Sequence, residues 1–155
     1  MTRKPDLFIV GAPKSGTTSV YEYLAGHPDL FMCPVKEPIY FCPDIGDPQR
    51  RTPIYPNEPG YLALFDAATD QRRVGEASTR YLFSHEAPGL VSEFHAQPFV
   101  VAMLRNPVEM IHALHNERVS QGHEQIDDFA AVADSYAPES PAAHIVAAQF
   151  GARAR

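Results

Sequence analysis

The chain has 155 residues, of which 45% are apolar and 21% charged, and its formal net charge is −6 at pH 7. This composition is typical of a single globular domain over residues 1–155, and it excludes intrinsic disorder and collagen-like repeats. The excess of acidic residues argues against nucleic acid as a partner, because binding to a phosphate backbone depends on a basic surface.

The apolar runs and the cysteines limit the location and the chemistry that we expect. No apolar stretch approaches the roughly 20 residues that cross a bilayer, and the run near the N-terminus is too short for a signal peptide. We therefore expect no membrane span and a cytoplasmic location. Cys33 and Cys42 lie in a proline-rich stretch without the spacing of a zinc site, which predicts two reduced thiols and no metal.

The first predicted elements are a strand, a glycine-rich turn and a helix. Residues 7–10 (LFIV) form a continuous apolar run, which is typical of a strand covered on both faces in a parallel sheet. Apolar residues then recur at helical spacing from Thr17 or Thr18 to about Ala25, and Gly26 supplies the stop.

The middle of the chain predicts a long surface loop and then short elements. Seven of the fifteen prolines fall between Pro34 and Pro59, and they forbid a long helix or a central strand there. Beyond this loop, the apolar pattern predicts a short helix over residues 61–65, a short strand over 74–77 and a helix over 90–94.

A second apolar run and a capped helix follow. Residues 99–104 (FVVAML) predict another strand that is buried on both faces. Asn106 suits the N-cap of the next helix, Pro107 its first position, and Glu109 the third position of a capping box. Gly122 marks the end of this helix. Two more helices are predicted, over residues 124–134 and 142–155.

The alternation of buried strands with helices predicts the fold class. It is typical of an α/β domain with a mainly parallel sheet flanked by helices. Ligands of such a domain bind at the carboxyl ends of the strands. The first apolar run ends in the segment 11–18 (GAPKSGTT) and the second in Arg105, so we expect the functional site at these two places.

The segment 11–18, called the anion loop below, lies between a strand and a helix. Its backbone N–H groups and the helix dipole are therefore placed to hold an anion. A nucleoside-triphosphatase loop carries its lysine directly after the second glycine, whereas here Thr17 stands in that place and the lysine is Lys14. Metal-free transfer of an anionic group is favoured over a kinase or NTPase. A plain turn before a capped helix is the simpler alternative.

These residues resemble a known family. Residues 8–24, with PKSGTT at 13–18, resemble the 5′-phosphosulfate-binding segment of the sulfotransferases that use 3′-phosphoadenosine 5′-phosphosulfate (PAPS). Residues 101–107, which end in Arg-Asn-Pro, resemble the 3′-phosphate-binding segment of that family, and residues 36–38 and 75–78 resemble its intervening motifs. The resemblance covers about residues 6–122. It implies a three-layer P-loop-like fold and metal-free sulfuryl transfer from PAPS to a hydroxyl or amine of a small molecule or glycan.

The resemblance also implies roles for single residues. Lys14 would contact the bridging oxygen and the 5′-phosphate, and Glu37 would be the base. Read without the family, Glu37 is a solvated loop glutamate, and His112 and His115 are alternative bases. The expected cofactor-binding residues are Pro13, Lys14, Ser15, Gly16, Thr17, Thr18 and, for the 3′-phosphate, Arg105. The expected acceptor-site residues are Lys36, Glu76, Ser78, Tyr81 and His115.

Three departures from the family pattern modify these expectations. Ala113 stands where a serine usually shares the 3′-phosphate, which predicts weaker cofactor binding. Ala77 stands where glycosaminoglycan-type members commonly have a lysine, which disfavours a polysaccharide acceptor. Family chains usually continue beyond the position of Arg155, so we expect a sheet that is incomplete toward the C-terminus, with an uncovered edge. The alternative function is therefore a weakly active or inactive nucleotide-binding or interaction domain.

Overall fold

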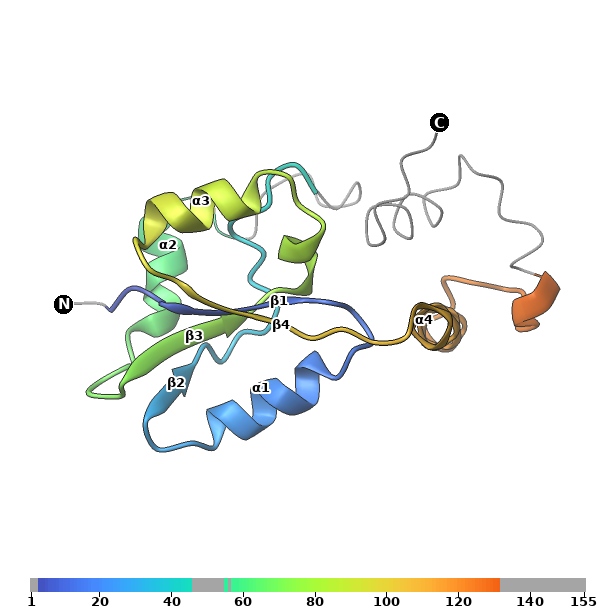
Figure 1. Ribbon diagram of the computed structural model, residues 1–155, viewed down its shortest axis with the longest axis horizontal. Helices are drawn as coiled ribbons and strands as arrows, with labels where there is room; N and C mark the ends of the chain where they lie inside the picture. Colours follow the sequence, from blue (N-terminus) through green and yellow to red (C-terminus); the bar gives the residue numbers. More distant parts are fainter. Residues whose placement is uncertain (1–2, 46–54, 56, 132–155) are drawn as a thin grey trace. The chain divides into compact units, whose positions relative to one another are not determined.

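The computed structural model describes residues 3–45, 55 and 57–131 of the chain. Its backbone forms two compact units, Met1–Leu104 and Arg105–Arg155. The first unit holds the sheet and the anion loop (Figure 1). Each unit is described below by itself.

The first unit is built on a parallel sheet of four strands in the order β2-β3-β1-β4. The strands are β1 (Leu7–Gly11), β2 (Leu30–Met32), β3 (Arg73–Ala77) and β4 (Phe99–Ala102). Helix α1 (Thr17–Ala25) covers one face, and α2 (Glu58–Leu62) and α3 (Ala87–Phe94) cover the other (Figure 1). Two 3₁₀ turns, η1 (Ala63–Phe65) and η2 (Thr79–Leu82), complete the unit. The predicted α/β fold with three layers is confirmed.

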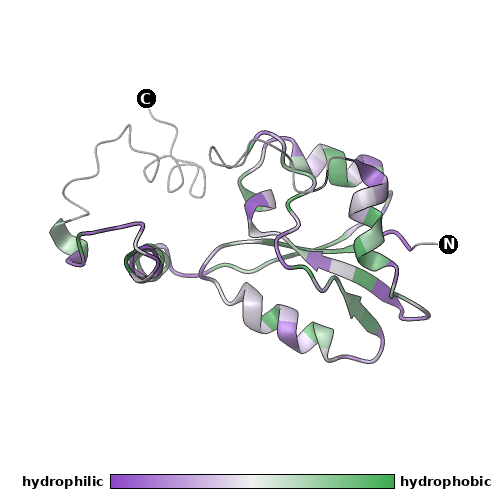
Figure 2. Cartoon of the chain, turned by 180° about the vertical axis from the view of Figure 1, so that it is seen from behind, coloured by the Kyte–Doolittle hydropathy of each residue, from purple (hydrophilic) through white to green (hydrophobic). Residues whose placement is uncertain are grey.

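The central strand β1 supplies both halves of the core. Phe8 points to the α2/α3 side, where a cluster of aromatic residues that includes Tyr61 and Phe65 is buried. Leu7 and Ile9 point to the opposite side, where they pack with Tyr21 of α1. Both faces of β1 are therefore buried, which explains why its sequence is continuously apolar. In Figure 2 the short strand β2 (LFM) is coloured as hydrophobic, whereas β3 (RVGEA) also carries hydrophilic residues.

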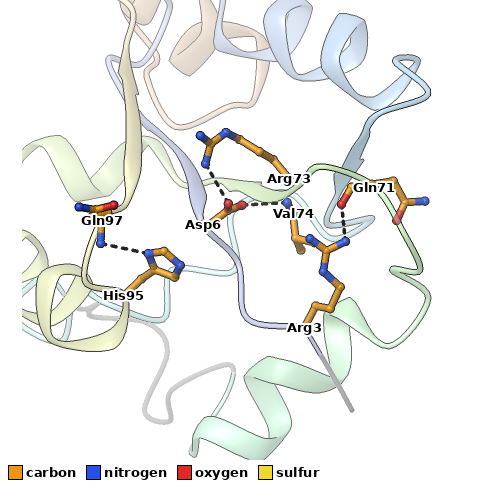
Figure 3. Close-up of polar contacts among 7 residues, drawn as sticks. All are labelled: Arg3, Asp6, Gln71, Arg73, Val74, His95 and Gln97. Carbon is orange, nitrogen blue, oxygen red and sulfur yellow. Dashed lines mark hydrogen bonds and ion pairs between the residues drawn. The ribbon is translucent and has the colours of Figure 1, made fainter.

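Polar contacts hold the amino ends of β1 and β3 in register. The Asp6 carboxylate accepts a hydrogen bond from the Val74 amide at 2.9 Å and pairs with the Arg73 guanidinium at 2.9 Å (Figure 3). Leu7 then lies opposite Gly75. Because parallel strands in this register end at the same edge of the sheet, the anion loop and the residues after β3 leave the sheet close together.

Most predicted elements are present, but the burial predicted for the strand at residues 99–104 is wrong. The structure confirms the first strand and α1, and the described part of the proline-rich loop, 34–45, 55 and 57–59, contains only the start of α2. Strand β2 was not predicted. β4 is not buried on both faces as expected: Phe99 and Val100 are 52% and 51% exposed. Among the described residues it pairs only with β1, so it is an edge strand with less to cover it.

The second unit consists of α4 (Pro107–Ser120) and the residues after it. The Asn106 side chain accepts a hydrogen bond from the Val108 amide at 3.0 Å, which confirms the predicted N-cap. Residues 124–128 are not helical, so the helix predicted over 124–134 is wrong at its start. The Glu124 carboxylate accepts from the amides of the next two residues, at 2.9 and 3.1 Å, and such side-chain turns compete with a helix.

Two sequence-based expectations fall partly or wholly outside this description. The helix predicted over residues 142–155 lies outside the described residues, as do positions 132–134 of the preceding one. None of the described helices is long and apolar enough to span a bilayer.

Candidate active site

The anion loop begins at a glycine that no other residue replaces without strain. Gly11 has φ +143°, and a Cβ there would lie 2.9 Å from the Cβ of Leu82 and 3.0 Å from the carbonyl oxygen of Thr79. The Gly11 carbonyl accepts a hydrogen bond from the Met103 amide at 2.7 Å, and the Ala12 amide donates to the Met103 carbonyl at 2.6 Å. The start of the loop is thus held between η2 and the end of β4.

The end of the anion loop leaves the N-terminus of α1 suited to an anion. Gly16 is the N-cap, with φ +83°, and within the described chain no side chain caps the helix and no acidic residue lies in its first turn. Lys14, partly buried, has φ +57°. Ser15 and Thr17 are buried and Thr18 is exposed. The first-turn amides, the helix dipole and the lysine together favour a negatively charged ligand.

Lys36 and Glu37 join this loop to the end of β3. The Lys36 ammonium donates a hydrogen bond to the Thr18 hydroxyl at the start of α1. The Glu37 carboxylate accepts from the Thr79 amide at 2.9 Å and from the Thr79 hydroxyl at 3.0 Å. Glu37 is therefore not the solvated loop glutamate that its sequence alone suggests. Sequence reasoning missed Thr79, although its place two residues after a predicted strand was a usable signal.

The Glu37 carboxyl group has a perturbed acidity. Burial raises the pKa of Glu37, and the hydrogen bonds from Thr79, together with the positive charges of Lys36 and Arg80, partly offset that rise. A carboxylate with a raised pKa is a stronger base than an exposed one. Glu37 is thus equipped to take a proton from a ligand beside the anion loop.

Glu76, Ser78 and Tyr81 lie inside the first unit rather than on its surface. The Glu76 side chain has no exposed area and accepts hydrogen bonds from the hydroxyls of Tyr61, Ser78 and Tyr81, at 2.7, 2.7 and 2.8 Å. Burial raises the pKa of Glu76 to about 7, although the three hydrogen bonds act to lower it. We call these four residues the buried carboxylate cluster. Their side chains face one another, not solvent. Sequence reasoning missed Tyr61, because an aromatic residue among apolar neighbours predicts only a place in the hydrophobic core.

The buried charge of Glu76 predicts a pH dependence of stability. Its pKa in the folded state, about 7, exceeds its ordinary value of 4.5, so the protonated form stabilises the folded chain. That contribution is complete below pH 4.5 and disappears as the pH rises through 7, a loss of about 3 kcal/mol. Urea unfolding of the wild type and Glu76→Gln at pH 5 and pH 8 measures it. Between pH 5 and pH 8 the free energy of unfolding of the wild type should fall relative to that of the variant. An equal change of this free energy in both proteins would contradict the prediction.

The remaining candidate residues belong to the second unit. The Arg105 Nε pairs with the Glu109 carboxylate at 3.1 Å, at the N-terminus of α4. His115 is buried, and its Nε2 lies 2.9 Å from the carbonyl oxygen of Ile126. His112 is exposed. His115 therefore binds a backbone carbonyl of its own unit, where it holds the non-helical segment after α4.

The chain is similar to known proteins over most of its length. Residues 5–137 match the model of the sulfotransferase family. The chain is 29% identical, over 169 aligned residues, to carbohydrate sulfotransferase 15 of Homo sapiens and of Mus musculus; the match covers 80% of this chain and 30% of each relative. The chain thus spans about a third of those relatives. The crystal structure of a sulfotransferase from Alicyclobacillus acidocaldarius matches with a TM-score of 0.76 at 29% identity, covering 96% of this chain and 67% of that one.

Proposed function

This chain belongs to the sulfotransferase family, and from that premise we propose that it transfers a sulfuryl group from PAPS to a hydroxyl or amine of an acceptor. One observation carries the proposal. The anion loop with Lys14 and the carboxylate of Glu37 come from different parts of the sequence, and the hydrogen bond from Lys36 to Thr18 joins them. A group for negative charge and a group for a proton are what such a transfer requires.

The residues of the anion loop fit an anionic donor. When bound, PAPS supplies the sulfuryl group, and its phosphate carries negative charge away. Lys14 offsets that charge, and the uncapped amides of α1 with the hydroxyls of Thr17 and Thr18 bind the phosphate oxygens. We assign the 3′-phosphate to Arg105, at the start of α4, where Glu109 competes for the guanidinium.

Glu37 handles the proton of the acceptor. Its carboxylate takes the proton from the acceptor hydroxyl or amine while the acceptor atom bonds to sulfur and the bond from sulfur to the phosphate oxygen breaks. The raised pKa of Glu37 strengthens it as a base, and its bonds to Thr79 fix the orientation of the carboxylate. Lys36, which donates a hydrogen bond to Thr18, adds positive charge at the start of α1.

The relatives support one class of acceptor. Their name describes them as carbohydrate sulfotransferases, so we propose a carbohydrate hydroxyl as the acceptor of this chain as well. Screening mono- and oligosaccharides against a panel of phenols and alcohols, with radioactive sulfate in the donor, distinguishes this class from other small molecules.

Donor recognition is tested by titration calorimetry. We expect the folded chain to bind 3′-phosphoadenosine 5′-phosphate without a metal and to bind ADP with Mg²⁺ much more weakly, because its lysine lies inside the loop rather than after it. Circular dichroism before each titration verifies the fold. Magnesium-dependent binding of ADP in preference would indicate a kinase or NTPase, and a folded chain that binds neither ligand would contradict the proposed donor.

A further inference from the structure

The buried carboxylate cluster contacts the loop that carries Glu37. The Ser78 hydroxyl donates a hydrogen bond to Glu76 at 2.7 Å and accepts one from the Ile39 amide at 3.1 Å. The Tyr81 hydroxyl donates to Glu76 at 2.8 Å and accepts from the next two amides of the loop, at 3.0 and 3.3 Å. Two hydroxyls thus connect one buried carboxylate to three consecutive amides, just after Glu37.

The direction of these hydrogen bonds depends on the charge of Glu76. A hydroxyl has one hydrogen to give, and an ionised carboxylate can only accept. With both hydrogens donated to Glu76, the oxygens of Ser78 and Tyr81 are left as acceptors, which is what the backbone amides need. A protonated Glu76 brings a hydrogen of its own. Where that hydrogen points at Ser78 or Tyr81 rather than at Tyr61, the hydroxyl turns and its oxygen is shared between the carboxyl hydrogen and the loop amide, which weakens the hydrogen bond of that amide.

The loop needs such support because its backbone is strained. Glu37 and Ile39 both have positive φ, at +57° and +56°, a region that residues other than glycine seldom adopt. The Glu37 amide donates to the Ala77 carbonyl at 2.9 Å, so the loop is tied to β3 on one side and to the cluster on the other. Such a conformation persists only where its surroundings hold it.

We infer that Glu76 is a positioning residue, which acts through Ser78 and Tyr81 on residues 39–41 and so orients the carboxylate of Glu37. The inference rests on the proposed function only in taking Glu37 as the base. It reassigns Glu76, Ser78 and Tyr81 from acceptor contact to support of the loop. It also gives a role to a carboxylate that has no exposed area, although burying its charge costs stability.

Hydrogen–deuterium exchange with matched variants tests the inference. In Tyr81→Phe the amides of Tyr40 and Phe41 lose their acceptor, so we expect their exchange at pH 8.5 to accelerate at least tenfold. Tyr61→Phe also removes a hydroxyl that donates to Glu76. It leaves the Ser78 and Tyr81 hydroxyls, which accept from the amides of residues 39–41, unchanged. Exchange of these amides should therefore stay within about twofold of the wild type. Equal effects in both variants, or none in Tyr81→Phe, would overturn the inference.

The pH dependence separates positioning from general stability. Relative to intrinsic rates, protection of the 39–41 amides should fall as the pH drops through 7 in the wild type, the opposite of the trend expected for global stability, and Glu76→Gln should lose this dependence. Among the described residues, the titratable groups that interact with Glu76 are Tyr61, Tyr81, Glu37, Cys33, Cys42 and Tyr55. Protection that does not vary with pH would overturn the inference.

Kinetics distinguish this inference from the proposed function. We expect Tyr81→Phe to lower kcat at least tenfold with little change in the KM of the donor, because the anion loop is untouched. Exchange that responds as expected in a chain without transfer activity would support the positioning and contradict the proposed function. An active chain whose kcat is indifferent to Tyr81→Phe would contradict the positioning alone.

Discussion

Replacing Lys14 with alanine is expected to reduce sulfuryl transfer about 10²- to 10³-fold, because charge on the leaving phosphate then lacks the cation that we assign to it. Lys14 is the only lysine of the anion loop, and the uncapped α1 amides that remain are partial charges. The effect should fall mainly on kcat, since the charge on the phosphate grows as the bond to sulfur breaks. Initial rates at saturating donor measure it.

Lys4→Ala is the matched control for this loss of charge. Lys4 pairs with Glu58 at 2.9 Å, and both side chains are about half exposed, a kind of pair that contributes little to stability. Its removal should leave the rate within about twofold of the wild type. A Lys14→Ala variant that transfers sulfate as fast as the parent would refute the assignment of the anion loop.

Glu37→Gln is expected to lower kcat about 10²- to 10⁴-fold, the range of general-base catalysis. The substitution keeps the shape of the side chain and an oxygen for Thr79 but removes the proton acceptor. In the wild type, kcat should fall toward acid, because Glu37 must be ionised and burial raises its pKa. The acid limb of the rate profile should therefore lie above the pH at which an exposed glutamate titrates, and it should be absent from the residual activity of the variant.

Two variants complete this experiment. Glu22→Gln removes an equal charge from the exposed surface of α1 and should leave kcat and its pH profile unchanged. His115→Ala tests the alternative base. Activity that survives in Glu37→Gln but is lost in His115→Ala would transfer the role of base to the histidine, against the hydrogen bond that His115 makes with Ile126.

Features that depend on neighbouring residues could be predicted from the sequence. The apolar run 7–10, the helix over 17–25 and the Asn106 cap are each specified within a few positions, by periodicity or by a single hydrogen bond. The anion loop could be recognised for the same reason, since its glycines, lysine and hydroxyls are consecutive. Lys14 and Thr18 can therefore be identified as candidate site residues from the sequence, without any tertiary contact.

Features that depend on distant residues could not be predicted in this way. β4 is as apolar as β1, yet among the described residues it has one neighbouring strand and an exposed surface. The composition of a strand does not reveal whether it lies at the centre or at the edge of a sheet.

The sequence by itself thus determined the fold class and the anion loop, because short-range patterns of hydrogen bonding and burial encode them, whereas only the family resemblance pointed to Glu37 as the base. Only the tertiary structure decided that Glu37 is held by Thr79 and that Glu76 is buried beneath its loop. The hydrogen bond between Thr79 and Glu37 and those from the loop amides to Ser78 and Tyr81 join residues about forty positions apart. The burial of the two carboxylates and the direction of their hydrogen bonds arise only when the loop after Glu37, strand β3 and the turn η2 pack together. The sequence of any one of these segments therefore does not reveal them.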